Sequence, residues 1–480
     1  MGGGGFNWEL KILGLFLVSI SFVNLIFSNN TFALFTPTLS AAIDNPAVSV
    51  NGNEVINSSN KTTEIPLSLT VNTNNKTGYT ITLNSETDEN ALVNTNSATN
   101  AKIDSISSAS ILSNFSNNTW GVKFGTNANF SPIPKLTSPT NIAQTTTKTN
   151  GNEVSNINLG LKLGNNLESG SYKNKLIFSI LTNRYDPIAK MATGQDFNSK
   201  LKSLETATNK IEHFKKSTTA PAATMYAINI EDNNSDYEIK LWLDPTDKTA
   251  YYYTEPEKVY LNEDSSKMFI RNRHENGLKD IKDLDLSNFN TSSVTDMSEM
   301  FCDLENLAFF DLSNFDTSNV TNMSYMLAGM NSLTFLDLSN FNTSKVTDMS
   351  GMFDALSGLT SLDLSNFDTS KVTNMYAMFA NMSSLISLNL SNFDTSKVTN
   401  MRYMFSLTNE YVINDRLEVI WVKNDFDTTK LTSYSDMFID RHKLRGGAGS
   451  HLADPSTADK SWLRIDDPVH GRPGYFTRKP

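Results

Sequence analysis

The sequence has a single cysteine, Cys302, among 480 residues. One thiol excludes an internal disulfide, and the lack of a cysteine near the start excludes a lipoprotein anchor. Stability must therefore come from packing and hydrogen bonds. Cys302 follows Phe301 in a repeated segment, and we expect it to be a small buried core residue.

Histidine and catalytic motifs are also scarce. The five histidines do not pair at the spacing of metal ligands, and no GxSxG, HExxH or P-loop pattern occurs. The sequence therefore predicts no enzymatic activity, no metal and no cofactor. The histidines are His213, His274, His442, His451 and His470.

Positive charge is in deficit as well. There are 40 Lys and Arg against 51 Asp and Glu, giving a formal net charge of -11. A nucleic-acid binder needs a basic face, so this class is excluded. Asn, Ser and Thr are dense instead, which is typical of a secreted or cell-wall environment.

The N-terminus does contain one long apolar run, Ile12 to Phe27, preceded by Lys11. We interpret residues 1–42 as an export signal, with candidate cleavage sites at Thr31-Phe32-Ala33 and Ser40-Ala41-Ala42. An uncleaved membrane anchor is the alternative, and would be the only membrane contact. Either reading predicts an extracellular or cell-surface location. No sortase-type LPxTG motif occurs near Pro480.

Residues 44–183 alternate apolar and polar positions in short runs, as in Leu67, Leu69 and Val71. This pattern predicts a β-sandwich. Phe197, Leu201 and Leu204 predict a short helix in a connector over residues 184–220. Residues 221–283 are predicted to form an entry module with a hairpin turn at residues 244–247.

The strongest signal is a repeat of 26 residues over residues 284–440, followed by an exit module over residues 441–480. Copies start at Leu284, Phe310, Leu336, Leu362 and Leu388, and a degenerate sixth copy follows an insertion of seven residues. A fixed period of this length indicates a solenoid, because one unit cannot fold without its neighbours. The predicted fold class is mainly β with short helices: an N-terminal β-sandwich followed by a leucine-rich-repeat-like solenoid.

Within each copy, we expect the LxLS run to be a short parallel strand. The turn after it should be held by Asp and Ser or Thr side chains, and a short helix should follow, from the VTNM segment to the Met-Phe pair. The predicted inward set of the copy that starts at Leu336 is Leu336, Leu338, Phe341, Val346, Met349, Met352, Phe353, Leu356 and Leu359.

If these side chains point inward, the alternate strand positions point outward. One outward column holds Asp285, Asp311, Asp337, Asp363 and Asn389, and the column beside it contains Phe309 and Phe335. We predict that these two phenylalanines and four aspartates bind a partner. The alternatives are a phenylalanine pair that packs together or lies under the entry hairpin, and a solvated acidic face that keeps the array soluble, with its field softened by Lys345, Lys371 and Lys397.

The repeat LDLSNFDTSKVTNMYAMF, at residues 362–379, resembles the BspA-type leucine-rich repeat, also catalogued as the 26-residue bacterial surface protein repeat. The resemblance extends over roughly Ala220 to Thr477. It implies a cell-surface protein, often an adhesin for host or neighbouring-cell proteins, and brings no catalytic residues. Many relatives carry a lipid or sortase anchor, and neither pattern is seen here.

We therefore predict an exported adhesin or interaction protein that binds a host or neighbouring-cell surface protein through its repeats. Two alternatives remain. The N-terminal β-domain could bind glycans by stacking sugars on Tyr79, Trp120 and Tyr172, although core packing also explains these side chains. The chain could instead be a structural spacer.

Overall fold

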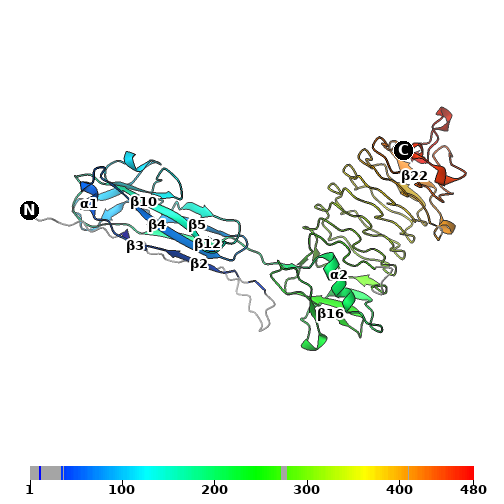
Figure 1. The fold of residues 1–480 in the computed structure, drawn as a ribbon, viewed down its shortest axis with the longest axis horizontal. Helices are drawn as coiled ribbons and strands as arrows, with labels where there is room; N and C mark the ends of the chain where they lie inside the picture. Colours follow the sequence, from blue (N-terminus) through cyan, green and yellow to red (C-terminus); the bar gives the residue numbers. More distant parts are fainter. Residues whose placement is uncertain (1–9, 12–33, 36, 272–277, 409, 480) are drawn as a thin grey trace, which may run out of the picture. The chain divides into compact units, whose positions relative to one another are not determined.

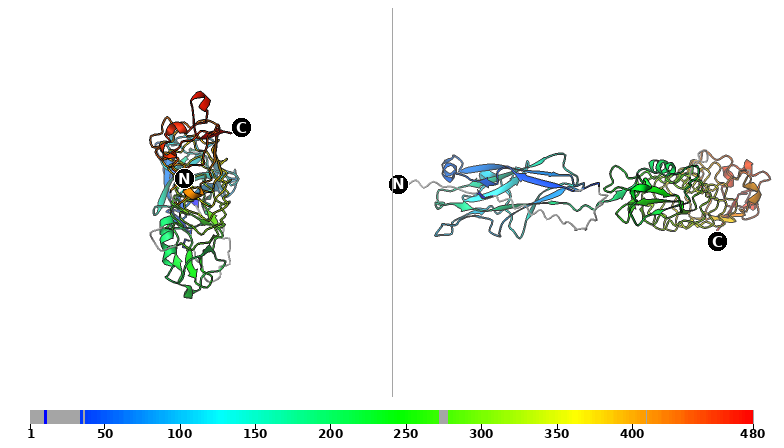
Figure 2. Two further views of the ribbon diagram at one scale, coloured as in Figure 1. Left: turned by 90° about the vertical axis from the view of Figure 1, so that its right-hand side faces the viewer. Right: turned by 90° about the horizontal axis from the view of Figure 1, so that it is seen from below.

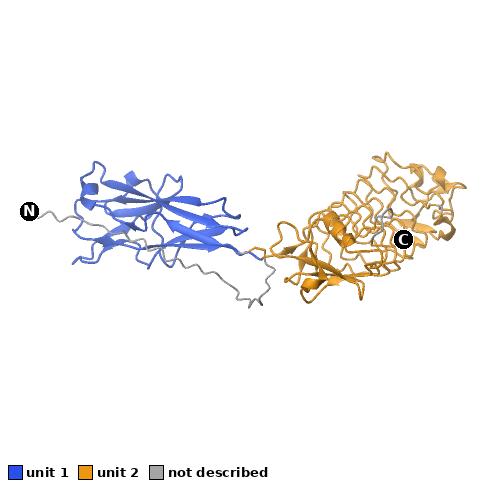
Figure 3. Cartoon of the chain, turned by 60° about the horizontal axis from the view of Figure 1, so that its bottom comes forward, with its two compact units in different colours: residues 1–29, 36–186 blue, residues 30–35, 187–480 orange. Residues whose placement is uncertain are grey.

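The computed structural model describes residues 10–11, 34–35, 37–271, 278–408 and 410–479. The apolar segment Ile12 to Phe27 and the cleavage candidate at residues 31–33 lie outside them. The chain divides into two compact units, one of residues 1–29 and 36–186 and the other of residues 30–35 and 187–480 (Figure 3). Among the described residues, no helix has the length and apolarity needed to cross a membrane.

The first unit contains two mainly antiparallel sheets, with a parallel pair between β7 (Lys102–Ser105) and β8 (Thr119–Phe124), that share one core, so the predicted sandwich is confirmed (Figures 1 and 2). A short helix, α1 (Gly52–Asn57), a turn of 3-10 helix, η1 (Leu112–Asn114), and the pair β1 (Leu10–Lys11) and β3 (Ala47–Val48) complete it. The larger sheet has the order β11 (Tyr172–Lys173), β6 (Leu92–Asn94), β7, β8, β10 (Glu153–Lys162), β4 (Thr62–Thr73), β2 (Leu39–Ile43), and the smaller has β12 (Leu176–Thr182), β5 (Tyr79–Ser85), β9 (Thr140–Gln144).

Alternation along the strands builds this core. Leu67, Leu69 and Val71 on β4 are buried and face Ile81 and Leu83 of the other sheet across the shared core. Apolar residues at every second position lie on one face of a strand, so both sheets can turn an apolar face inward.

Strand β2 changes the N-terminal boundary. Leu39 pairs with Thr73 and Ile43 with Leu69, so β2 forms the edge of the larger sheet. The second cleavage candidate, Ser40-Ala41-Ala42, lies inside this strand. The sandwich therefore begins no later than Leu39, and residues 39–42 do not belong with a removable leader.

The second unit begins with an entry module. Its elements are β13 (Ala189–Lys190), α2 (Gly194–Ser203), β14 (His213–Lys216), η2 (Ala223–Met225), β15 (Ile228–Asn229), β16 (Lys240–Asp244), β17 (Thr249–Tyr253) and β18 (Val259–Tyr260). Helix α2 confirms the prediction made from its apolar spacing, and Thr193 caps it by accepting the backbone N–H of Asp196. The hairpin predicted at residues 244–247 joins β16 and β17.

The predicted connector over residues 184–220 is largely part of this module. Phe197 and Leu201 of α2 are fully buried, and the Phe197 ring lies 5.7 Å from that of Phe214 on β14. The prediction of a separate connector is wrong from Pro187 onward, because these apolar side chains fill the same core as the repeats.

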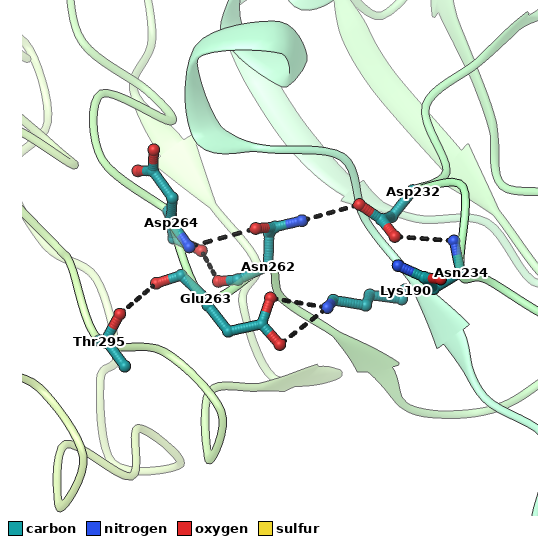
Figure 4. Close-up of polar contacts among 8 residues, drawn as sticks. Lys190, Asp232, Asn234, Asn262, Glu263, Asp264 and Thr295 are labelled. Carbon is teal, nitrogen blue, oxygen red and sulfur yellow. Dashed lines mark hydrogen bonds and ion pairs between the residues drawn. The ribbon is translucent and has the colours of Figure 1, made fainter. Parts of the chain in front are cut away.

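Polar contacts link segments of the entry module to one another and, through Thr295, to the first coil (Figure 4). Lys190 Nζ lies 2.7 and 2.9 Å from the two carboxylate oxygens of Glu263, and the Thr295 hydroxyl donates to the Glu263 carbonyl at 3.2 Å. Asn262 donates to Asp232 at 2.9 Å. The Thr295 bond thus adds a side-chain contact to the strand pairing that joins the module to the array.

The repeats form coils that stack in parallel, one coil per 26 residues (Figure 1). A single bridge per coil runs through Asp296, Asn322, Asp348, Asn374, Asn400 and Ser433. Longer strands occur mainly at the ends, as β19 (Asp283–Leu284), β20 (Phe289–Asn290), β21 (Ser387–Asn389), β22 (Val419–Val422) and β23 (Phe476–Arg478). The strands predicted at every LxLS run are therefore absent from the described central coils.

The helix predicted after each VTNM segment is also wrong. In the coil that starts at Phe310, the N–H of Met323 donates to Asp348 O at 3.0 Å and that of Tyr325 to Ser350 O at 2.7 Å. These donors bond to the next coil instead of to residues four positions back. Tyr325 has φ 53°, a left-handed conformation that cannot continue an α-helix.

Buried polar ladders hold the coils together. Thr343 donates its hydroxyl to Asp368 O at 2.9 Å and accepts the Asp368 N–H at 2.8 Å. Asn366 donates to Leu338 O and Phe341 O of the preceding coil at 2.9 and 2.8 Å. The predicted turn chemistry holds for Asp368, which accepts the Ser370 N–H. The threonine instead bonds to the neighbouring coil.

One continuous apolar core runs from the entry module through the coils to the exit module. Eight of the nine predicted inward side chains of the copy at Leu336 are buried, and Leu336 itself is partly buried. Tyr252 closes one end of this core, and Tyr475 and Phe476 close the other. Short 3-10 turns complete the C-terminal part: η3 (Val412–Asn414), η4 (Pro455–Thr457), η5 (Lys460–Trp462) and η6 (Pro468–His470).

Candidate functional site

The two phenylalanines of the predicted site lie on the surface. Phe309 and Phe335 are each 62% exposed, while the neighbouring Phe310 and Leu338 are buried. They occupy equivalent positions in adjacent coils, which places their backbones about 4.8 Å apart. At this exposure neither ring lies under the entry hairpin, so that alternative does not hold.

The four aspartates of the predicted site form a second exposed column, which we call the acidic ladder: Asp285, Asp311, Asp337 and Asp363. Each Oδ1 accepts the backbone N–H of the serine two residues later, at 2.8 to 3.1 Å. This is an Asx-turn, a local device that ends the LxLS run. One carboxylate oxygen of each residue is therefore occupied by the fold.

The turns also lower the pKa of three of the four ladder carboxylates. The backbone N–H of the following serine holds the pKa of Asp311, Asp337 and Asp363 below its ordinary value, and the serine hydroxyl adds to this. The Asp337 charge opposes the effect at Asp311 and Asp363, and Lys479 reinforces it at Asp363. Among the described residues, no Lys or Arg lies within ion-pair distance of the four carboxylates.

The fifth coil shows that this turn does not need a charge. Asn389 stands at the ladder position and its Oδ1 accepts the Ser391 N–H at 3.2 Å and the Ser391 hydroxyl at 2.7 Å. An amide oxygen thus makes the same contacts as a carboxylate. The negative charges of the other four coils are not required by the turn, and their mutual repulsion works against stacking.

Sequence reasoning missed how far this face extends. Lys215 and Tyr251 continue the outward column in the entry module, next to Asp285, and the Lys215 Nζ lies 5.4 Å from the Tyr251 ring. At the other end Trp421 pairs with Asn389 and Thr477 with Trp421. The column therefore passes from an aromatic and basic end, through the acidic ladder, to a half-exposed tryptophan.

The place of Trp421 in the outward column could not be predicted, because the seven residues inserted between the fifth and sixth coils lie partly before and partly after β22. Strand pairing relates Asn389 to Trp421, an offset of 32 residues, while the bridge relates Asn400 to Ser433, an offset of 33. Six of the seven inserted residues therefore precede β22 and one follows it. The regular spacing of the phenylalanine column does not reveal this division.

The proposed sugar-stacking residues lie inside the sandwich. Tyr79, Trp120 and Tyr172 are at most 2% exposed. Each polar group is bonded internally: Trp120 Nε1 donates to Asn90 O at 3.0 Å, and the Tyr172 hydroxyl donates to Glu168 O at 2.8 Å. These three residues cannot form an exposed stacking platform.

Neither a cluster of metal ligands nor the hollow in the exit module provides a second site among the described residues. No group of three or more potential metal ligands occurs in the part of the chain that the structure describes. A polar hollow of about 700 Å³ in the exit module is lined by Asp466, Arg472 and Arg478, among others. Asp466 is occupied there, because it accepts the N–H groups of Ala448, Ser450 and Gly474. The glycine-rich RGGAGS loop thus binds an internal carboxylate.

A family model described as "Mycoplasma protein of unknown function, DUF285" matches residues 263–361 and 329–451. The matched region starts in the entry module, covers the coils with their exposed columns, and ends in the exit module. This chain is therefore similar to that family over its repeat region. No curated protein matches the chain.

Proposed function

We propose that this chain is an exported surface protein of the BspA-type repeat class that binds a protein partner through the outward face of its coils. The partner carries a basic surface with an apolar pocket. Phe309 and Phe335 enter that pocket, and the acidic ladder pairs with the basic groups around it. The partner belongs to a host or neighbouring cell.

One observation carries this proposal: two large apolar side chains stand 62% exposed beside four exposed carboxylates, none of which has a Lys or Arg within ion-pair distance among the described residues. Exposed phenylalanines contribute nothing to the core, and a row of like charges opposes stacking. Aromatic side chains supply much of the binding energy at protein interfaces. Charged groups around them speed association and select the partner.

The competing functions have less support. The hypothesis of glycan binding by the sandwich depended on three aromatic residues. These are buried, so they cannot stack on a sugar. A structural spacer would not need an exposed phenylalanine pair. It would also not need aspartate at the ladder position, because Asn389 makes the same turn contacts without a charge. The 26-residue period, the acidic composition and the apolar N-terminal segment remain consistent with an exported adhesin.

The test uses the intact protein on a panel of extracellular proteins. Phe309→Ser combined with Phe335→Ser should weaken binding to the captured partner at least tenfold, or by about 1.4 kcal/mol. The melting temperature should barely move, since both rings are exposed. Ile413→Ser, which removes another exposed apolar side chain, is the control. Unchanged binding, or binding lost only with unfolding, would refute the site.

A further inference from the structure

A second group of partly exposed side chains lies on a different segment of the coils, between two buried methionines of each coil. It consists of Tyr325, Tyr376, Tyr403 and Arg402, which we call the tyrosine patch. All three tyrosines are half-buried and Arg402 is exposed. None of these residues belongs to the acidic ladder or the phenylalanine pair, so the patch is independent of the proposed function.

The backbone does not favour tyrosine here. Tyr325 and Tyr403 have φ of 53° and 60°, in the left-handed region, and the same position is left-handed in every coil. Glycine and aspartate tolerate this conformation best, and they occupy it as Gly351 and Asp436. A bulky ring at such a position is an outlier that the fold does not require.

The rings come from the second, fourth and fifth coils, and the third coil has Gly351 at the position of Tyr325. The Tyr325 ring lies over the next coil, where a Cβ on Gly351 would come within 2.2 Å of it. Tyr376 comes from the fourth coil and Tyr403 from the fifth, with centroids 5.8 Å apart. The Arg402 guanidinium lies 4.6 Å from the Tyr403 ring and donates to its hydroxyl at 2.8 Å.

The ring orientation discriminates between ligand classes. Tyr376 and Tyr403 are inclined at 89°, and Arg402 covers one face of Tyr403. A glycan platform needs aromatic faces turned to solvent in one plane, which this pair cannot provide. Two perpendicular rings in edge-to-face contact instead form a corner, against which a compact apolar ring such as proline can pack. Tyrosine hydroxyls beside this corner can donate to backbone carbonyls.

We propose that the tyrosine patch binds a proline-rich segment of another protein in the polyproline II conformation. That helix has no internal hydrogen bonds, so its carbonyls are free to accept, and it is already ordered before binding. It repeats every 9.3 Å or so, about the height of two coils. A segment lying along the stack therefore presents one proline turn to Tyr325 and the next to the perpendicular pair.

The neighbouring coils provide variants that the fold already accepts. Ser350 occupies the position of Tyr376, and its N–H makes the same turn bond, to Asp348 at 2.8 Å, as that of Tyr376 to Asn374 at 3.1 Å. Ala377 occupies the position of Tyr403. Tyr376→Ser with Tyr403→Ala should therefore fold normally. Arg402→Ser is a milder second variant.

The experiment titrates the full chain with an oligoproline peptide of about twelve residues, or four polyproline II turns. We expect saturable binding below about 1 mM, no binding of a Gly-Ser peptide of equal length, and at least tenfold weaker binding by the double variant. Tyr226→Ala, which removes another exposed tyrosine, should have no effect. If the double variant has a lower melting temperature than the wild type, Arg402→Ser replaces it in the test. This variant should bind the peptide more weakly and keep the wild-type melting temperature.

Three outcomes would overturn the proposal. They are no saturable oligoproline binding, equal binding by the wild type and the folded variants, or saturation by a linear oligosaccharide in place of the peptide. A purely structural patch would lower the melting temperature in the variants without any peptide effect. Because the phenylalanine pair is intact in all these variants, failure here leaves the proposed adhesin site untouched.

Discussion

The sandwich and the coil array place their aromatic residues differently. In the sandwich, Trp120 and Tyr172 are buried and their polar atoms are bonded internally. In the array, the core is filled by repeated columns of Phe, Met, Val and Leu, and further aromatic residues such as Phe335 stand outside it. A repeated core thus separates the residues that fold the chain from those that are free to bind.

The largest expected effect concerns the ends of the array. A fragment of residues 284–407 should not unfold cooperatively, because it lacks the residues that cover its terminal coils. Phe289 loses Tyr252, whose ring centroid lies 5.9 Å away, and Phe405 loses Phe438 at 5.2 Å. Open ends of a stacked array expose core. Thermal melting of this fragment and of a longer fragment, residues 187–480, followed by circular dichroism, checks the prediction. Equally cooperative unfolding of the two fragments would contradict it.

The next effect contrasts buried and exposed rings within the array. Phe353→Ala should lower the free energy of unfolding by about 3–5 kcal/mol, because the ring is fully buried and stacked 5.7 Å from Phe379. Phe335→Ser should change it by less than about 0.5 kcal/mol. Urea denaturation measures both. Similar losses for the two variants would mean that the exposed ring is structural after all.

The sequence predicts the apolar part of the array well, because a strict period reveals which positions share an environment. Val346, Met349 and Phe353 were all assigned inward and are buried. It fails on the helix, because nothing in a linear pattern shows that the Tyr325 N–H donates to the next coil. The acidic ladder and the phenylalanine pair were found by strand alternation, but Trp421 required the observed pairing.

A smaller effect separates buried from exposed threonine ladders. Thr343→Val should cost about 2 kcal/mol, because it leaves the N–H and carbonyl of Asp368 without their partner. Thr347→Val is the matched control: its hydroxyl donates to Thr321 O at 3.2 Å, but the residue is exposed, so water replaces the bond. Its cost should stay below about 0.5 kcal/mol. Equal costs in urea denaturation would contradict the account of the ladders.

The smallest effect concerns strand β2. Deleting residues 1–42 should lower the free energy of unfolding of the sandwich by about 1 kcal/mol and leave the array unchanged. Leu39 and Ala41 pack against the sandwich core, and both are lost. Deleting residues 1–36 keeps β2 and removes the two-residue strand β1, so its effect on the sandwich should be smaller. If an exported form is cleaved, mass spectrometry should place its N-terminus before Leu39. A mature chain that starts at Ile43 would contradict this.

The central claim is that the charges of the acidic ladder serve binding and not folding. The most direct measurement is the affinity of the captured partner for a variant in which Asp285, Asp311, Asp337 and Asp363 are all replaced by Asn. Asn389 shows that the turn accepts this residue. We expect binding at least tenfold weaker, with a reduced dependence on salt, and an equal or higher melting temperature. Unchanged affinity with unchanged salt dependence would contradict the account.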